Sequence, residues 1–141
     1  MKPYVSLPSL MLSFLITISS FAQDWPNFKE FKEANIELSS LINDEKRVVF
    51  MGNSITIGWL QTNPNFFEGK PYVNRGISGQ TTPQMLVRFR ADVIDIQAAA
   101  VVILAGTNDI AGNTGPSTLE MILDNIKSMT EIAQAKLIVK F

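Results

Sequence analysis

Three apolar segments, each followed by a polar turn and then by a helical pattern, constrain the fold of this chain more than any other feature. The segments are residues 47–51, 72–74 and 98–105. The last of them is an unbroken apolar run, which is typical of a central parallel strand covered on both faces. Strands that alternate with helices are joined by right-handed crossovers into a parallel sheet. The sequence therefore predicts an α/β protein, a three-layer α/β/α sandwich with a parallel sheet.

The intervals between these segments carry helical patterns. They are residues 25–42, 55–60, 83–89 and 119–133, with a short turn at 92–96. Asp24 and Thr82 are the expected caps of the first and third helices, because each stands shortly before a proline in a first turn. A further apolar strand is expected at residues 137–139, with no helix after it to cover its last face. We therefore expect a C-terminally incomplete domain. A short complete fold whose last strand is a sheet edge is the alternative.

The first 22 residues have the pattern of an export signal that is cleaved. Lys2 gives a positive start, residues 10–18 are almost wholly apolar, and Ser-Phe-Ala at residues 20–22 suits a signal peptidase. A membrane anchor is the alternative, but the apolar segment is well short of the ~20 residues that span a bilayer. We expect cleavage near Ala22. The domain would then be residues 23–141, exported to the periplasm or the medium with no stable membrane anchor.

The composition of the chain excludes several classes of function. It has 141 residues, a formal net charge of -1, no cysteine and no histidine. The near-neutral charge provides no basic patch, which argues against a nucleic-acid partner. The absence of cysteine removes disulfides, thiol nucleophiles and thiolate metal sites together. Without histidine, and with no carboxylates at the spacing of a calcium loop, we expect no metal and no cofactor.

Polar residues follow each of the three expected strands, and parallel strands place their carboxyl ends at one edge of the sheet. In Gly-Asn-Ser-Ile-Thr at residues 52–56, the Ser54 hydroxyl lies beside helix N-terminal amides. In the loop at residues 75–81, Gly79 can expose a backbone amide. Asn108, in Gly-Thr-Asn-Asp, can donate its side-chain amide. A hydroxyl with converging N–H donors has the parts of a nucleophile and its oxyanion hole.

Each of these signals also has a structural explanation. Ser54 could cap the helix that follows it, the glycine loop could be a tight turn, and Asn-Asp after a strand is ordinary turn chemistry. The Gly-x-Ser-x-Gly elbow of the α/β-hydrolases is not met, because Thr56 occupies its second glycine position. The occurrence of all three segments in order favours the catalytic interpretation.

Together the three segments resemble the first three blocks of the SGNH, or GDSL-type, esterases and acylhydrolases. The matching stretches are Gly-Asn-Ser-Ile-Thr, Asn-Arg-Gly-Ile-Ser-Gly-Gln-Thr-Thr and Gly-Thr-Asn-Asp-Ile. The resemblance runs from about residue 24 to residue 133 and implies a flavodoxin-like fold. It implies that Ser54 is the nucleophile, and that the Ser54 and Gly79 amides and the Asn108 side chain form the oxyanion hole. The implied reaction is hydrolysis of small-molecule carboxylic esters through an acyl-serine, on acetylated carbohydrates or lysophospholipid-type esters.

The chain departs from this family pattern in ways that affect function. Asn53 replaces the family's Asp, Gln80 stands where many relatives carry Asp, and the last block, Asp-x-x-His, has no counterpart. Asp109 cannot replace the missing histidine, since a carboxylate beside the oxyanion donors would oppose the developing charge. We therefore expect the 141-residue chain alone to be inactive. The alternatives are a non-catalytic module that binds a ligand such as an acetylated glycan, and a phosphate or nucleotide binder, which would lack a P-loop lysine.

Overall fold

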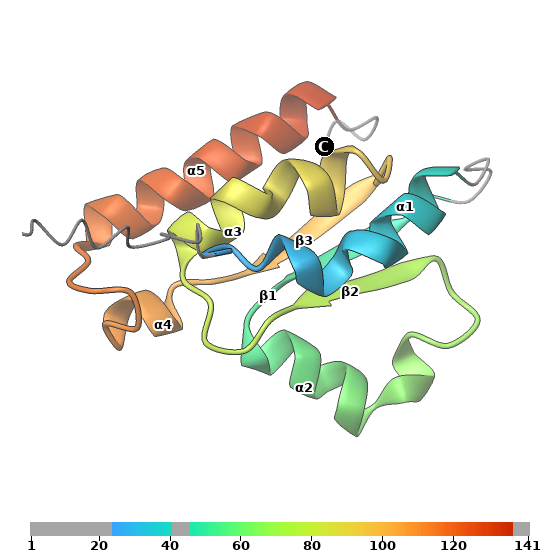
Figure 1. Cartoon of the computed structure of the whole chain (residues 1–141), viewed down its shortest axis with the longest axis horizontal. Helices are drawn as coiled ribbons and strands as arrows, with labels where there is room; N and C mark the ends of the chain where they lie inside the picture. Colours follow the sequence, from blue (N-terminus) through green and yellow to red (C-terminus); the bar gives the residue numbers. More distant parts are fainter. Residues whose placement is uncertain (1–23, 41–45, 137–141) are drawn as a thin grey trace, which may run out of the picture.

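The computed structural model describes residues 24–40 and 46–136 of the chain. Three parallel strands form one sheet in the order β2-β1-β3 (Figure 1). They are β1 (Val48–Gly52), β2 (Tyr72–Gly76) and β3 (Ala100–Leu104). In the register, Gly52 lies opposite Gly76 on one side and opposite Leu104 on the other. The predicted parallel sheet is confirmed, and all three strands end at the same edge.

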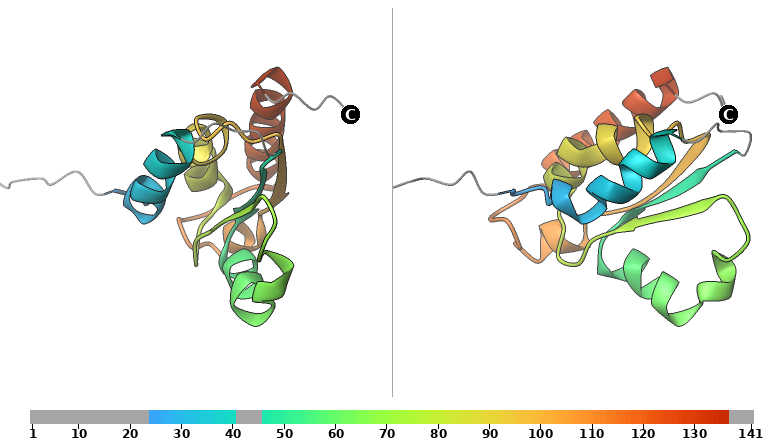
Figure 2. Two further views of the ribbon diagram at one scale, coloured as in Figure 1. Left: turned by 90° about the vertical axis from the view of Figure 1, so that its right-hand side faces the viewer. Right: turned by 45° about the vertical axis from the view of Figure 1, so that its right-hand side comes forward.

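Helices precede β1, occupy both connections between the strands and follow β3. They are η1 (Phe28–Phe31), α1 (Lys32–Ser40), α2 (Ser54–Thr62), η2 (Pro64–Phe66), α3 (Thr82–Phe89), η3 (Arg90–Ile94), α4 (Thr107–Ile110) and α5 (Leu119–Lys136). Helices α1, α3 and α5 lie on one side of the sheet and α2 on the other, as Figures 1 and 2 show. The result is the predicted arrangement of helices on both faces of a parallel sheet.

The alternation of side chains along β1 supplies both faces of the sheet. Val49 and Met51 are fully buried against α3 and α5, in a core that also contains Met85, Phe89, Val93, Ile96, Ala98, Met129 and Ala133. Phe50 points to the opposite face, where its ring contacts Trp59, Phe66, Phe67 and Tyr72 edge to face. This second cluster holds α2 and η2 against the sheet, and so fixes the element that begins with Ser54.

The position of β3 differs from the expectation of a strand covered on both faces. It is an edge strand of the described sheet, and the side chains of Val102 and Leu104 are 48% and 38% exposed. Helix α2 packs over Phe50 and β2 and leaves this half of the face open. An unbroken apolar run marks a strand for burial but does not say which element of the chain covers it.

Two predicted helix starts also need adjustment. The Asp24 carboxylate accepts hydrogen bonds from the Phe28 and Lys29 amides, yet the first helical turn begins only at Phe28. The hydrogen bond from the Lys29 amide, and after it the one from the Phe28 amide, lowers the pKa of Asp24. At α3 the cap is Thr81 instead of Thr82, because Thr81 and Gln84 form a reciprocal capping box.

The predicted export signal and the predicted strand at residues 137–139 lie outside the described residues. Within residues 24–40 and 46–136, no helix combines the length and the apolar character needed to cross a membrane.

Candidate active site

Ser54 is the first residue of α2 and directly follows the turn at the end of β1. The helix is capped by its neighbour, since the Asn53 side chain accepts a hydrogen bond from the Ile55 amide at 3.0 Å. The Ser54 side chain is exposed, and its hydroxyl makes no hydrogen bond to another described residue. The structural explanation of Ser54 as the helix cap is therefore wrong, and its hydroxyl is left available for chemistry.

The turn that carries Ser54 packs directly on the end of β2. The Ile77 amide donates to the Gly52 carbonyl at 3.1 Å. A side chain on Gly76 would place its Cβ only 2.4 Å from the Ile57 nitrogen, so this approach requires glycine. The Asn74 amide reinforces the contact by donating to the Thr56 carbonyl at 2.7 Å.

Gly79 lies in the loop that follows β2 and has a φ of +77°, in the left-handed region that favours glycine. It is exposed, and its amide donates no hydrogen bond within the described part of the chain. Its carbonyl accepts from the Asn113 side chain at 3.0 Å, which holds the loop from the far side. The Gly79 amide is thus held in a fixed loop and has no partner of its own, as an oxyanion donor requires.

Asn108 lies in α4, directly after β3, and connects the third segment to the second. Its Nδ2 donates to the Gln80 carbonyl at 2.9 Å. A primary amide carries two N–H donors, so one remains for a ligand. The adjacent Thr107 hydroxyl accepts from Asn53 Nδ2 at 2.8 Å, which ties the third segment to the Ser54 turn. The three sequence segments are therefore joined to one another by direct hydrogen bonds.

Asp109 lies in α4 and is 2% exposed, and its carboxylate binds the N-terminus of α3. Its carboxylate accepts from the Thr82 amide, at 3.0 Å to each oxygen, and from the Thr82 hydroxyl at 2.6 Å. The carboxylate is thus occupied by hydrogen bonds at the N-terminus of α3. No local sequence pattern indicates this contact, because Asp109 and Thr82 are 27 positions apart.

A cavity of about 400 Å³ lies beside the Gly79 loop. Its lining is made of neutral residues: Asn27, Ile77, Ser78, Gly79, Gln80, Gln84, Asn113 and Thr114. A smaller apolar cavity of about 130 Å³ includes Ile55, the residue after Ser54, together with Trp59, Val102 and Leu104. The described residues contain no group of three acidic side chains placed to hold a metal ion.

Comparison with known proteins places this geometry in context. The sequence model of a family described as GDSL-like lipase/acylhydrolase matches residues 50–139. No curated protein matches the chain. Among solved structures, a protein from Bacteroides fragilis assigned as an acylhydrolase is 53% identical, with a TM-score of 0.77 over 81% of this chain. A GDSL-like lipase from Bacteroides thetaiotaomicron is 51% identical, with a TM-score of 0.76 over 79% of this chain.

A more distant likeness is one of fold alone. An acetylxylan esterase from Geobacillus stearothermophilus, solved as two catalytic mutants, has 23% identity and TM-scores of 0.54 and 0.53 over 68% of this chain and 57% of its own length. The chain spans 55% of the length of each of the two Bacteroides proteins.

Proposed function

The chain belongs to the GDSL-like lipase/acylhydrolase family, and we propose that it is the part of a serine esterase that carries the nucleophile and the oxyanion hole. The observation that carries this proposal is the state of Ser54. Its hydroxyl is exposed and unbonded among the described residues because Asn53 caps α2. The segments with Gly79 and Asn108 are hydrogen-bonded into the same edge of the sheet.

The proposed reaction has two covalent steps. The Ser54 Oγ attacks the carbonyl carbon of an ester, and the carbonyl oxygen becomes an oxyanion that accepts from the Ser54 and Gly79 amides and the Asn108 side chain. The bond from carbon to the alcohol oxygen then breaks, and the alcohol leaves with a proton. Water hydrolyses the acyl-serine to release the acid. A donor of this kind contributes about 3 kcal/mol to transition-state stabilisation.

The base for this reaction is the missing component. The 141 residues contain no histidine, and Asp109 is engaged at α3. Loss of a triad base lowers the rate by several orders of magnitude. We therefore expect the 141-residue chain alone to hydrolyse esters slowly or not at all. The reading frame beyond Phe141 provides the direct test: an Asp-x-x-His block there supports the proposal, whereas a frame without one favours a non-catalytic binding module.

The substrate that we propose is a small acyl ester of a polar alcohol, such as an acetylated carbohydrate. The cavity beside Gly79 supports this choice, because its neutral amides and hydroxyls suit hydroxyl groups better than an alkyl chain or a charge. A lysophospholipid-type ester is the second candidate, favoured by the apolar cavity next to Ile55.

Export is the corresponding proposal for location, with signal cleavage near Ala22. It is supported by the charged start and the apolar stretch of the leader. Sequencing the N-terminus of protein recovered from the periplasm or the medium tests it: a mature start at residue 23 agrees, and an intact leader does not.

Steady-state hydrolysis by the protein made from its whole reading frame tests the function. We expect p-nitrophenyl acetate to be cleaved with a higher kcat/KM than p-nitrophenyl octanoate, and Ser54→Ala to remove the activity. If Ser54→Ala binds an acetylated oligosaccharide as tightly as the parent protein and the parent shows no turnover, the binding-module alternative is correct.

A further inference from the structure

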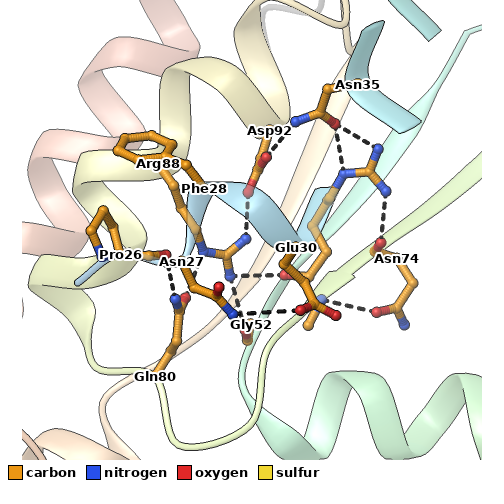
Figure 3. Close-up of polar contacts among 12 residues, drawn as sticks. Pro26, Asn27, Phe28, Glu30, Asn35, Gly52, Asn74, Gln80, Arg88 and Asp92 are labelled. Carbon is orange, nitrogen blue, oxygen red and sulfur yellow. Dashed lines mark hydrogen bonds and ion pairs between the residues drawn. The ribbon is translucent and has the colours of Figure 1, made fainter. Parts of the chain in front are cut away.

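Arg88, a fully buried residue of α3, contacts both loops of the candidate active site. Its Nη2 donates to the Arg75 carbonyl at 2.9 Å and to the Gly52 carbonyl at 3.3 Å. Its Nε donates to the Gln80 side-chain oxygen at 2.5 Å. Gly52 lies two residues before Ser54, and Gln80 directly follows Gly79. One guanidinium thus connects the segment that carries the nucleophile to the segment that carries an oxyanion donor (Figure 3).

The guanidinium of Arg88 is also bound on its other side, away from these loops, by Asp92. Asp92 forms an ion pair with Nη1 at 2.6 Å, and Asn35 of α1 donates to the other Asp92 oxygen at 2.6 Å. Burial lowers the pKa of Arg88, and the hydrogen bond and charge of Asp92 oppose that shift. Because a buried charge is costly unless it is paired and hydrogen-bonded, the guanidinium is confined to one position.

Gln80 connects Arg88 to the two segments that carry the candidate oxyanion donors. Its side chain is 3% exposed and is held from two sides, by Arg88 Nε and by the Pro26 carbonyl, to which its Nε2 donates at 2.7 Å. Its own carbonyl accepts the Asn108 side-chain amide. A displacement of Gln80 would therefore move the Gly79 amide and the Asn108 amide together.

We infer that Arg88 is a positioning residue, which fixes the Gly79 and Asn108 amides relative to Ser54 through Gln80. The inference rests on the proposed function of those three residues. An arginine suits this role because its planar fork donates in several fixed directions at once, whereas a lysine has a single point of charge on a flexible stem. Arg88→Lys would keep the charge opposite Asp92 and lose the simultaneous contacts to Gln80 and the two carbonyls.

The first test measures the loop itself and needs no turnover. Backbone ¹⁵N order parameters are recorded for the protein made from its whole reading frame, as the parent and with Arg88→Lys or Arg47→Lys. Arg47 is a matched control, a buried arginine that donates to the Ile96 carbonyl and contacts neither loop. For Arg88→Lys, we expect the values at Gly79 and Gln80 to fall from about 0.85 to below about 0.6, and Arg47→Lys to leave them unchanged.

A second variant keeps the inference testable if Arg88→Lys does not fold. Gln80→Met removes the acceptor for Arg88 Nε, together with the donor to the Pro26 carbonyl, and leaves the pair with Asp92. We expect the same loss of order at Gly79. A Gly79 amide that stays as ordered as in the parent protein, in a folded Arg88→Lys or in Gln80→Met, overturns the inference.

The functional test uses the protein made from its whole reading frame and p-nitrophenyl acetate. We expect Arg88→Lys to lower kcat about tenfold with little change in KM, and Arg47→Lys to leave both unchanged. If Ser54→Ala abolishes turnover but Arg88→Lys keeps the parent kcat, the positioning role is wrong and the proposed function stands. If Ser54→Ala retains turnover, the proposed function is wrong, and the order parameters alone decide the role of Arg88.

Discussion

At the scale of single residues, neighbouring polar side chains divide between structure and chemistry. Asn53 caps α2 and leaves the Ser54 hydroxyl unbonded among the described residues. Asp109 accepts hydrogen bonds from Thr82 at the start of α3, whereas Asn108 beside it keeps one amide hydrogen available. In both pairs the residue next to the candidate catalytic group makes the structural hydrogen bonds. The sequence predicts which polar residues gather at this edge, but it does not say which of each pair supports the fold.

This division predicts the effect of removing the Asp109 carboxylate. Asp109→Ala would leave the buried Thr82 amide and hydroxyl without their acceptor, so we expect a loss of about 2 kcal/mol in the free energy of unfolding. Urea denaturation monitored by circular dichroism measures it. Asp95→Ala, at an exposed carboxylate, is the control and should change the stability by less than about 0.5 kcal/mol. Equal stabilities for the two variants would show that the hydrogen bonds between Asp109 and Thr82 do not stabilise the fold.

At the scale of elements, the end of β2 packs against the start of α2 so closely that no side chain fits between the two backbones. A Cβ on Gly76 would meet three backbone atoms of the segment from Asn53 to Ile57 at 3.0 Å or less. Backbone atoms cannot move aside as a flexible side chain does. The end of β2 and the turn that carries Ser54 must therefore keep a fixed separation.

Two glycine-to-alanine substitutions, one at the contact and one away from it, test this close approach. Gly76→Ala should lower the free energy of unfolding by about 1–3 kcal/mol, because of overpacking against backbone. Gly58→Ala lies within α2 and meets nothing within 4 Å. It should raise the stability by about 0.5–1 kcal/mol, through the higher helix propensity of alanine. Thermal unfolding of both variants checks the pair, and a neutral Gly76→Ala would contradict the close approach.

The sequence predicts the elements that depend on neighbouring residues better than the contacts between residues far apart in the chain. The three parallel strands and the helix of residues 119–133 follow from local periodicity, and the resemblance to the family blocks predicts Ser54, Gly79 and Asn108 as the candidate site residues. The hydrogen bonds between Asp109 and Thr82 and the contacts of Arg88 with Gly52 and Gln80 bring together residues distant in the chain. A single sequence carries no local signal for such pairs. Arg88 in particular has the appearance of an ordinary charged residue on a helix.

At the scale of the whole molecule, the open half of the sheet face is the main feature of the described structure. Val102 and Leu104 are exposed on β3, whose outer edge pairs with no other described strand. An exposed apolar edge strand is a site for pairing with another chain. We therefore expect the 141-residue chain to self-associate.

Sedimentation velocity over a range of concentrations measures that association. Val102→Lys places a charge on the exposed face of β3 and should shift the distribution towards monomer. Ile110→Lys, at a side chain on α4 that is 74% exposed, is the matched control and should have little effect. A parent chain that is monomeric at every concentration would show that β3 does not mediate self-association.

Covalent labelling of the protein made from its whole reading frame distinguishes an activated nucleophile at Ser54 from an unreactive hydroxyl. A fluorophosphonate probe reacts with an activated serine, and mass spectrometry of the digested adduct locates the modified residue. We predict stoichiometric labelling on the peptide that contains Ser54, no labelling of Ser54→Ala, and slow labelling of the 141-residue chain alone. Labelling at another serine, or none in the whole-frame protein, would show that Ser54 is not the nucleophile.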